Sequence, residues 1–411
     1  MTLKPINIIF KICVFALTFF NFLTYSHSNI LDLNKDSKNI SNYFSGSVAF
    51  NNFDYITSKQ YFDKFSKSEK DNQKLSSSFL KSLINLQKYN EAITYSKNLE
   101  SKNLSNFESL LFLGLEEFKN KNYIKAKFYF NELKPNFENQ LVFAPLKLSL
   151  INWSEIMISN KVSDIKLLQS MPNNFGSFKS IQEVFAYCYF DNLDVDVKFE
   201  KNIKNEGDKF YRYNFFYANY LIEKNRKKEA VSILDSSANK YPRNLLINQL
   251  RENLKKNNKS KNKFSCQNPE DILAEIFYAF ANALSVQKRF ELSNLYINFS
   301  KYLNSNFKSY DALLAENLLR LGKKTDSKKI FLKLFEIGSF YKWNSSKEIA
   351  LIIEDLEGNE KSLIYLTKIY KNIDKNLYRT FDYANFLRGH DKFSKSITLY
   401  SEILSEISKD H

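Results

Sequence analysis

The sequence predicts an all-α protein in which helix–turn–helix units stack into a solenoid. Apolar residues recur at steps of three and four, as in 107–119, where Leu110, Leu113 and Phe118 lie on one helical face. Small residues return every 34 positions over much of the chain. Glycine and proline number only 8 and 6 among 411 residues, whereas average proteins contain roughly 12% of the two together. So few turn-forming residues disfavour a β-sandwich or a barrel.

Residues 1–28 have the pattern of a secretory signal peptide. Lys4 and Lys11 supply positive charge, an apolar run follows over 12–23, and small residues precede a cleavage site after Ser28. The alternative is an uncleaved anchor, because the apolar stretch around Lys11 is long enough to span a membrane, although this lysine interrupts it. We therefore predict export to the periplasm or envelope, with anchoring in the inner membrane as the alternative.

Residues 29–242 are predicted to form a first array of helix pairs. Its small positions recur at intervals of 34 in both helices of each pair. They are Gly46 and Gly114 in the first helices, with Leu80 at the matched position between them, and Ser58, Ala92 and Ala126 in the second helices. The spacing is lost over 136–205, which we interpret as degenerate repeats, and it returns with Ala218 and Ala230. The small residues are expected to let neighbouring helices approach closely.

A polar and basic stretch then predicts a linker over 243–272, followed by a second array over 273–411. The small positions of the second array recur at intervals of 34, 35 and 34. They are Ala281, Ala315, Ala350 and Ala384 in the first helices and Ser293, Ser327, Ser362 and Ser396 in the second helices. Each serine hydroxyl is expected to bond to a carbonyl one turn earlier in its own helix.

The pair at 107–135, FESLLFLGLEEFKNKNYIKAKFYFNELKP, resembles the 34-residue tetratricopeptide repeat (TPR). Similar units cover 39–135, 211–242 and 274–407, and the leader with the opening and closing units looks like secreted TPR proteins of alphaproteobacteria. The resemblance implies a right-handed superhelix. Its concave wall would be lined by the first helices and would bind protein or peptide partners.

The resemblance also implies which side chains face that groove. Three units carry an aromatic residue four positions before an asparagine, which places the two on one helical face, and one of them adds an arginine. These residues are Phe215, Asn219, Tyr278, Asn282, Phe381, Asn385 and Arg388. An asparagine can donate to and accept from a peptide backbone. Alternatively, the asparagines reflect an asparagine-rich composition and the aromatic rings pack against the next unit.

Motifs for catalysis or cofactor binding are missing. The histidines are His27, His390 and His411, of which the first lies in the leader and the last ends the sequence. Zinc sites, Ser-His-Asp triads and Cys-His pairs therefore lack parts, and no phosphate loop or dinucleotide fingerprint occurs. We expect a protein that is not an enzyme and has no cofactor or metal.

The net charge of +15 comes from lysines spread along the chain. Without an arginine-rich cluster or an RNA-binding signature, nucleic acid is not the predicted partner. Outside the leader, Cys188 and Cys266 either pair or stay as buried thiols. We predict a scaffold or adaptor of the bacterial envelope. The alternative is a cell-wall or glycan-associated factor, since aromatic rings stack on sugars and lysines attract anionic polymers.

The last predicted unit stops near residue 407 with few polar residues beyond it. An uncapped final helix exposes an apolar stripe, and such stripes often mark interaction sites. We therefore expect this end of the solenoid to be a surface through which copies of the protein associate.

Overall fold

The structure, a computed structural model, describes most of the chain after the leader. The described residues are 30–65, 73–135, 140–161, 168, 170–171, 175–205 and 211–407. The signal-peptide prediction lies outside them. Within these ranges the secondary structure is helical, and the one pairing of β type is an isolated bridge between Asn262 and Phe307. The predicted all-α class is therefore confirmed.

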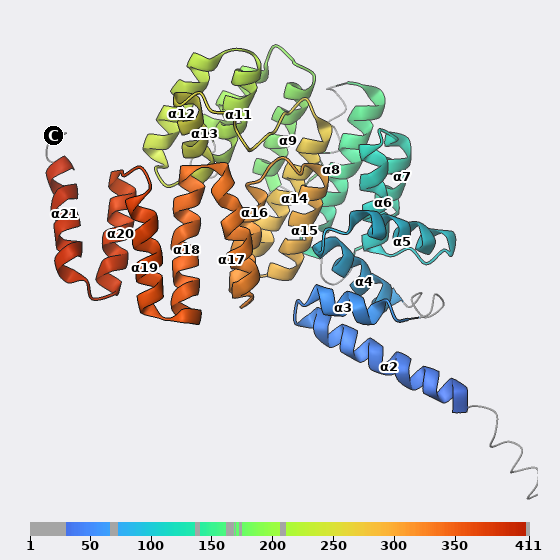
Figure 1. The fold of residues 1–411 in the computed structure, drawn as a ribbon. Helices are drawn as coiled ribbons and strands as arrows, with labels where there is room; N and C mark the ends of the chain where they lie inside the picture. The colour runs from blue at the N-terminus through green and yellow to red at the C-terminus, as the bar shows by residue number, and fades with distance from the viewer. Residues whose placement is uncertain are drawn as a thin grey trace, which may run out of the picture.

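Most helices pack against their neighbours in the chain, and the second part of the array folds back against the first (Figure 1). The first part contains α2 (Ile30–Asn51), α3 (Tyr55–Phe62), α4 (Gln73–Asn85), α5 (Tyr89–Ser101), α6 (Phe107–Lys119), α7 (Tyr123–Glu132), α8 (Gln140–Ser159), α9 (Gly176–Tyr189), α10 (Val195–Asn205), α11 (Tyr211–Glu223), α12 (Lys227–Lys240) and α13 (Leu245–Lys255). The second part contains α14 (Pro269–Val286), α15 (Phe290–Leu303), α16 (Tyr310–Arg320), α17 (Lys324–Lys333), a 3-10 turn (Leu334–Ile337), α18 (Ser339–Glu357), α19 (Asn359–Lys371), α20 (Leu377–Gly389) and α21 (Phe393–Ile407).

Helix pairs turn back tightly even though the sequence contains few glycines. Most turns within a pair place one non-glycine residue in the left-handed region, with φ between 56° and 63° at Gln87, Lys121, Asn225, Lys288 and Asp391, among others. Such a conformation costs roughly 1–2 kcal/mol for a residue with a side chain. Packing of the two helices must offset this cost, so glycine content alone does not reveal these turns.

The predicted small positions are all buried. In the first array, a small side chain on one helix of a pair is matched by a large side chain on the other helix. A Cβ added at Gly114 would lie 2.4 Å from Cε1 of Phe130, and one at Gly46 would lie 2.5 Å from Cε1 of Phe62. The unit between them has the opposite arrangement, with Leu80 on the first helix and Ser96 on the second, both completely buried. Each pair of positions therefore holds one large and one small side chain.

In the second array each marker serine bonds across the helix pair rather than within its own helix. Ser293 Oγ donates to the carbonyl of Ala281 at 2.7 Å, and Ser327 Oγ donates to the carbonyl of Ala315 at 2.8 Å. Ser362 and Ser396 make the same bond to Ala350 and Ala384 at 2.7 and 2.8 Å. The acceptor is the first-helix small residue, whose missing bulk brings its carbonyl within reach of the hydroxyl.

The segment predicted as a linker, 243–272, is packed into the molecule. It contains α13, and its residues Phe264 and Cys266 are buried in an apolar core that runs through helices of both arrays. Cys266 forms a disulfide with Cys188 of α9, with the two Cα atoms 5.8 Å apart. The sequence pattern predicted a linker because polar and basic residues surround the few apolar residues of α13. No helix in the described part of the chain has the length and apolar character that a membrane span requires.

Candidate functional site

The groove residues predicted on α11 and α14 lie where the two arrays meet. Phe215 is 1% exposed and its ring packs 5.7 Å from that of Phe307. Tyr278 is half-buried, with its ring 5.2 Å from that of Tyr310. Asn219 donates to the backbone carbonyl of its own helix at 2.9 Å, whereas Asn282 is exposed. The two aromatic rings therefore join parts of this chain and are covered by it.

A buried ion pair holds the same junction. Arg212 of α11 donates from Nε and Nη2 to the two carboxylate oxygens of Glu275 of α14, at 2.6 and 2.9 Å. Its guanidinium also lies 4.0 Å above the ring of Tyr278. Burial raises the pKa of the Glu275 carboxyl, and the facing guanidinium opposes that shift. Loss of one partner of such a pair costs about 3–5 kcal/mol because the other charge stays buried.

The candidates on α20 remain within reach of solvent. Phe381 is 43% exposed and packs 6.0 Å from the ring of Tyr400. Asn385 Oδ1 accepts from the Tyr400 hydroxyl at 2.7 Å, and Arg388 is exposed. Of the seven predicted groove residues, Asn282, Phe381 and Arg388 are thus the ones with exposed side chains.

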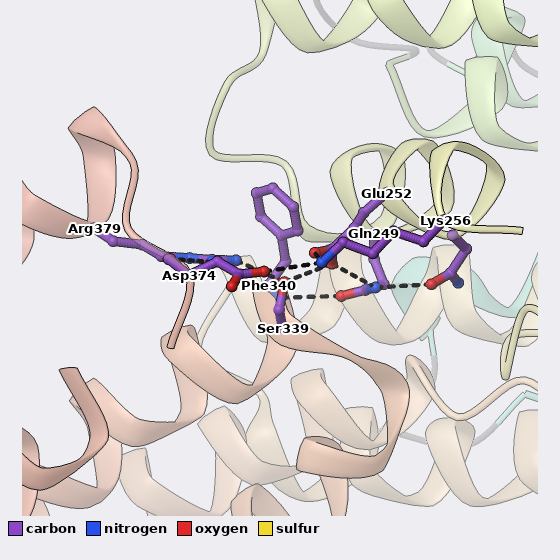
Figure 2. A network of polar contacts seen from close by, with 8 residues as sticks. Gln249, Glu252, Lys256, Ser339, Phe340, Asp374 and Arg379 are labelled. Atoms are coloured by element: carbon purple, nitrogen blue, oxygen red, sulfur yellow. Dashed lines mark hydrogen bonds and ion pairs between the residues drawn. The ribbon is translucent and has the colours of Figure 1, made fainter. Parts of the chain in front are cut away.

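A third intramolecular contact joins α13 to α18 and α20 (Figure 2). Gln249 Oε1 accepts from the Phe340 N–H at 3.0 Å, which satisfies a backbone donor in the first turn of α18. Glu252 accepts from the Ser339 hydroxyl at 2.5 Å. Arg379 donates to the same hydroxyl at 2.7 Å and lies 4.8 Å above the Phe340 ring. These polar contacts hold α18 and α20 against α13, which lies in the segment predicted as a linker.

Helix α15 covers part of the inner wall of the first array. The ring of Tyr302 lies 5.0 Å from that of Tyr89 and 4.8 Å from that of Phe112. Asn298 Nδ2 donates to Asn85 Oδ1 at 3.1 Å. These side chains of the first array therefore pack against the second array and are covered by it.

An open cleft of about 1260 Å³ remains between α2, α4, α6 and α7. Its lining includes Tyr43 and Ser47 of α2 and Ser77 and Lys81 of α4. Lys81 lies 3.4 Å from Glu108 of α6, and both side chains are buried in the cleft floor. This cleft was not predicted from the sequence, because the predicted groove residues come from units in which an aromatic residue stands four positions before an asparagine. Ser47 and Lys81 stand directly after Gly46 and Leu80, as those asparagines stand directly after the matched small residues, so the signal was present.

Among known proteins, only solved structures resemble this chain. No family model matches the sequence, and no curated protein matches it. Similar solved structures include the P58(IPK) TPR domain, with 13% identity, a TM-score of 0.26 and coverage of 89% of this chain and 92% of that one. Yeast Tom70 has 14% identity and a TM-score of 0.26, with coverage of 90% of this chain and 85% of that one. A Rap protein complexed with Competence and Sporulation Factor has 14% identity and a TM-score of 0.23, with coverage of 91% of this chain and 98% of that one. Because these TM-scores are low, the assignment of a TPR-like solenoid rests on the helix pairs and their 34-residue period.

Proposed function

We propose that this protein is a non-enzymatic adaptor that holds a segment of a partner protein in the cleft between α2, α4, α6 and α7. The observation that carries the proposal is the contrast along the inner wall. Part of that wall is covered by α15 or closed at the α11–α14 junction, whereas about 1260 Å³ stays open here. Within the described residues, no cluster of three or more metal-ligating side chains occurs that would suggest metal chemistry.

The lining favours a partner segment with apolar side chains. Phe44, Val48 and Phe128 line the cleft and are more than half exposed, so covering them removes apolar surface from water. Ser47 and Ser77 supply hydroxyl groups that both donate and accept, which suits a peptide backbone. Lys81 and Glu108 lie 3.4 Å apart, so these two charges of the lining face each other and need no charged ligand.

We propose further that the protein is exported and works in the periplasm or envelope. The leader pattern of residues 1–28 supports this location, and so does the Cys188–Cys266 disulfide, because such bonds persist in oxidising compartments. An uncleaved leader would instead anchor the chain in the inner membrane. The mass of the protein purified from envelopes separates the two, since cleavage after Ser28 leaves Asn29 as the first residue.

A cell-wall or glycan-associated role remains the alternative, but no contact in the described residues favours it over a protein partner. Cosedimentation with purified cell-wall sacculi tests it directly. A chain that pellets with sacculi, and yields no crosslinked protein from the cleft, would replace the adaptor proposal.

The adaptor proposal is tested by placing a photocrosslinking residue at Ser77 in the cleft and, as a control, at Lys368. The control is an exposed position on α19. We expect Ser77 to crosslink to one protein in the native envelope and Lys368 not to do so. A Ser77→Trp variant should obstruct part of the cleft and reduce copurification of that protein. Equal crosslinking from both positions, or unchanged copurification by Ser77→Trp, would contradict the proposal.

A further inference from the structure

Helix α2 exposes an apolar stripe along one side. Ile40, Phe44 and Val48 follow one another at steps of four, so they share a helical face. Each is between 58% and 62% exposed. Three large apolar side chains in a row on one face differ from the scattered apolar residues that ordinary surfaces carry, and such patches often mark interaction sites.

Helix α21 exposes a second stripe. Phe393, Ile397, Leu404 and Ile407 recur at helical spacing, and they are between 43% and 67% exposed. On the same helix only Ser396 and Ile403 are buried. Figure 1 shows α2 and α21 at opposite ends of the array.

The repeat period identifies what the α21 stripe is shaped to contact. Leu404 stands one period after Tyr370 of α19, whose ring stacks on Tyr383 of the following unit at 4.1 Å. Ile397 stands one period after Leu363, which packs into the core that α19 shares with α20. The α21 stripe therefore repeats a surface that, one unit earlier, is covered by the first helix of the next pair.

The α2 stripe repeats the complementary surface. Phe44 stands two periods before Phe112 of α6, whose ring lies 6.2 Å from Tyr89 of the preceding unit. Val48 stands one period before Ser82 of α4, whose hydroxyl lies 3.2 Å from that of Ser58 in the preceding unit. In α4 and α6 this face covers the unit before it.

We propose that α2 of one copy packs on α21 of a second copy, so that the array continues from one molecule into the next. Each stripe then meets the kind of surface that its counterparts meet inside the chain. Since the two surfaces differ and lie at opposite ends, the contact is heterologous and produces a chain of copies rather than a closed two-fold dimer. Phe44 and Val48 also line the cleft, so a second copy packed on α2 and a segment held in the cleft would compete for these two side chains, and assembly is measured on the purified chain without a partner.

The test is sedimentation equilibrium of the full chain with one end blocked at a time. Phe44→Glu blocks the α2 stripe and Ile397→Glu blocks the α21 stripe, and both side chains are exposed, so the fold is retained. We expect the unmodified chain to form species larger than a dimer as concentration rises. Each variant alone should be a monomer, with association weakened by about 30-fold or more. An equimolar mixture should form a heterodimer and nothing larger, because each variant keeps one intact end.

Several outcomes would overturn the proposal. If Phe44→Glu alone forms a dimer, the α21 stripes pair with each other. If Ile397→Glu alone forms a dimer, the α2 stripes do so. A chain that stays monomeric at every concentration, or a mixture that stays monomeric, would also exclude it. Val286→Glu serves as the control, because this side chain is 77% exposed and belongs to neither stripe. It should assemble as the unmodified chain does, and circular dichroism of each variant checks that the helices are intact.

Discussion

Exchanging the large and small side chains between α6 and α7 tests the packing rule of the first array. In the chain, Gly114 faces Phe130, whereas the preceding unit places Leu80 opposite Ser96. The variant Gly114→Leu/Phe130→Ala gives the third unit the arrangement of the second. Alanine replaces serine in the design because Ser96 Oγ is buried without a hydrogen-bond partner.

The magnitudes follow from the contacts. Gly114→Leu places a Cβ 2.4 Å from Phe130 Cε1, and such overpacking costs about 1–3 kcal/mol, partly offset by the better helix propensity of leucine, worth under about 1 kcal/mol. Phe130→Ala removes a fully buried ring and costs about 3–5 kcal/mol. If the two side chains share one space, the double variant should cost at least about 2 kcal/mol less than the sum of the single variants.

The assay is urea unfolding followed by circular dichroism at the helical band, with hydrogen exchange of α6 amides as a local readout. The local readout is needed because a long repeat array need not unfold in one step. The matched control is Gly114→Leu combined with Phe199→Ala, a buried phenylalanine of α10 in another unit, which should show simple additivity. Additivity within about 0.5 kcal/mol for Gly114→Leu/Phe130→Ala itself would refute the reasoning.

Three further predictions follow from particular contacts. Ser327→Ala should lower the free energy of unfolding by about 0.5–1.5 kcal/mol, because it loses the bond to the Ala315 carbonyl, and a urea midpoint equal to that of the unmodified chain would deny this bond a role. Gly338→Ala should weaken the contact between α13 and the start of α18, because the added Cβ would lie 2.1 Å from Gln249 Nε2, and hydrogen exchange at the start of α18 should become faster. Gly358→Ala is the control, since Gly358 also has a positive φ but has open space around it, and this variant should leave that exchange unchanged. Burial raises the pKa of Asp271 to about 7, so the folded state binds its proton more tightly than the unfolded state, and this contribution to stability is lost as the pH rises from about 4 through 7. Asp271→Asn should therefore flatten the fall in urea midpoint across that range, and an unchanged slope would show that Asp271 does not cause it.

The sequence by itself determined the helix pairs and their small positions. The contacts that the 34-residue period encodes are local, although the marker serines bond to a residue 12 positions earlier and not, as predicted, within their own helix. Helical spacing and short turns fix such neighbours without reference to the rest of the molecule.

Only the tertiary structure decided which parts of the inner wall stay open. Small rotations between successive units accumulate along a solenoid, so the path that brings Arg212 onto Glu275, 63 residues away, is set by the whole array. The disulfide from Cys188 to Cys266 spans 78 residues and depends on the same path. A repeat pattern specifies each step of the superhelix, but small changes in each step decide whether distant units meet. For this reason the groove assigned from the pattern at Phe215 and Tyr278 is covered, while the cleft beside Ser47 and Ser77 remains open.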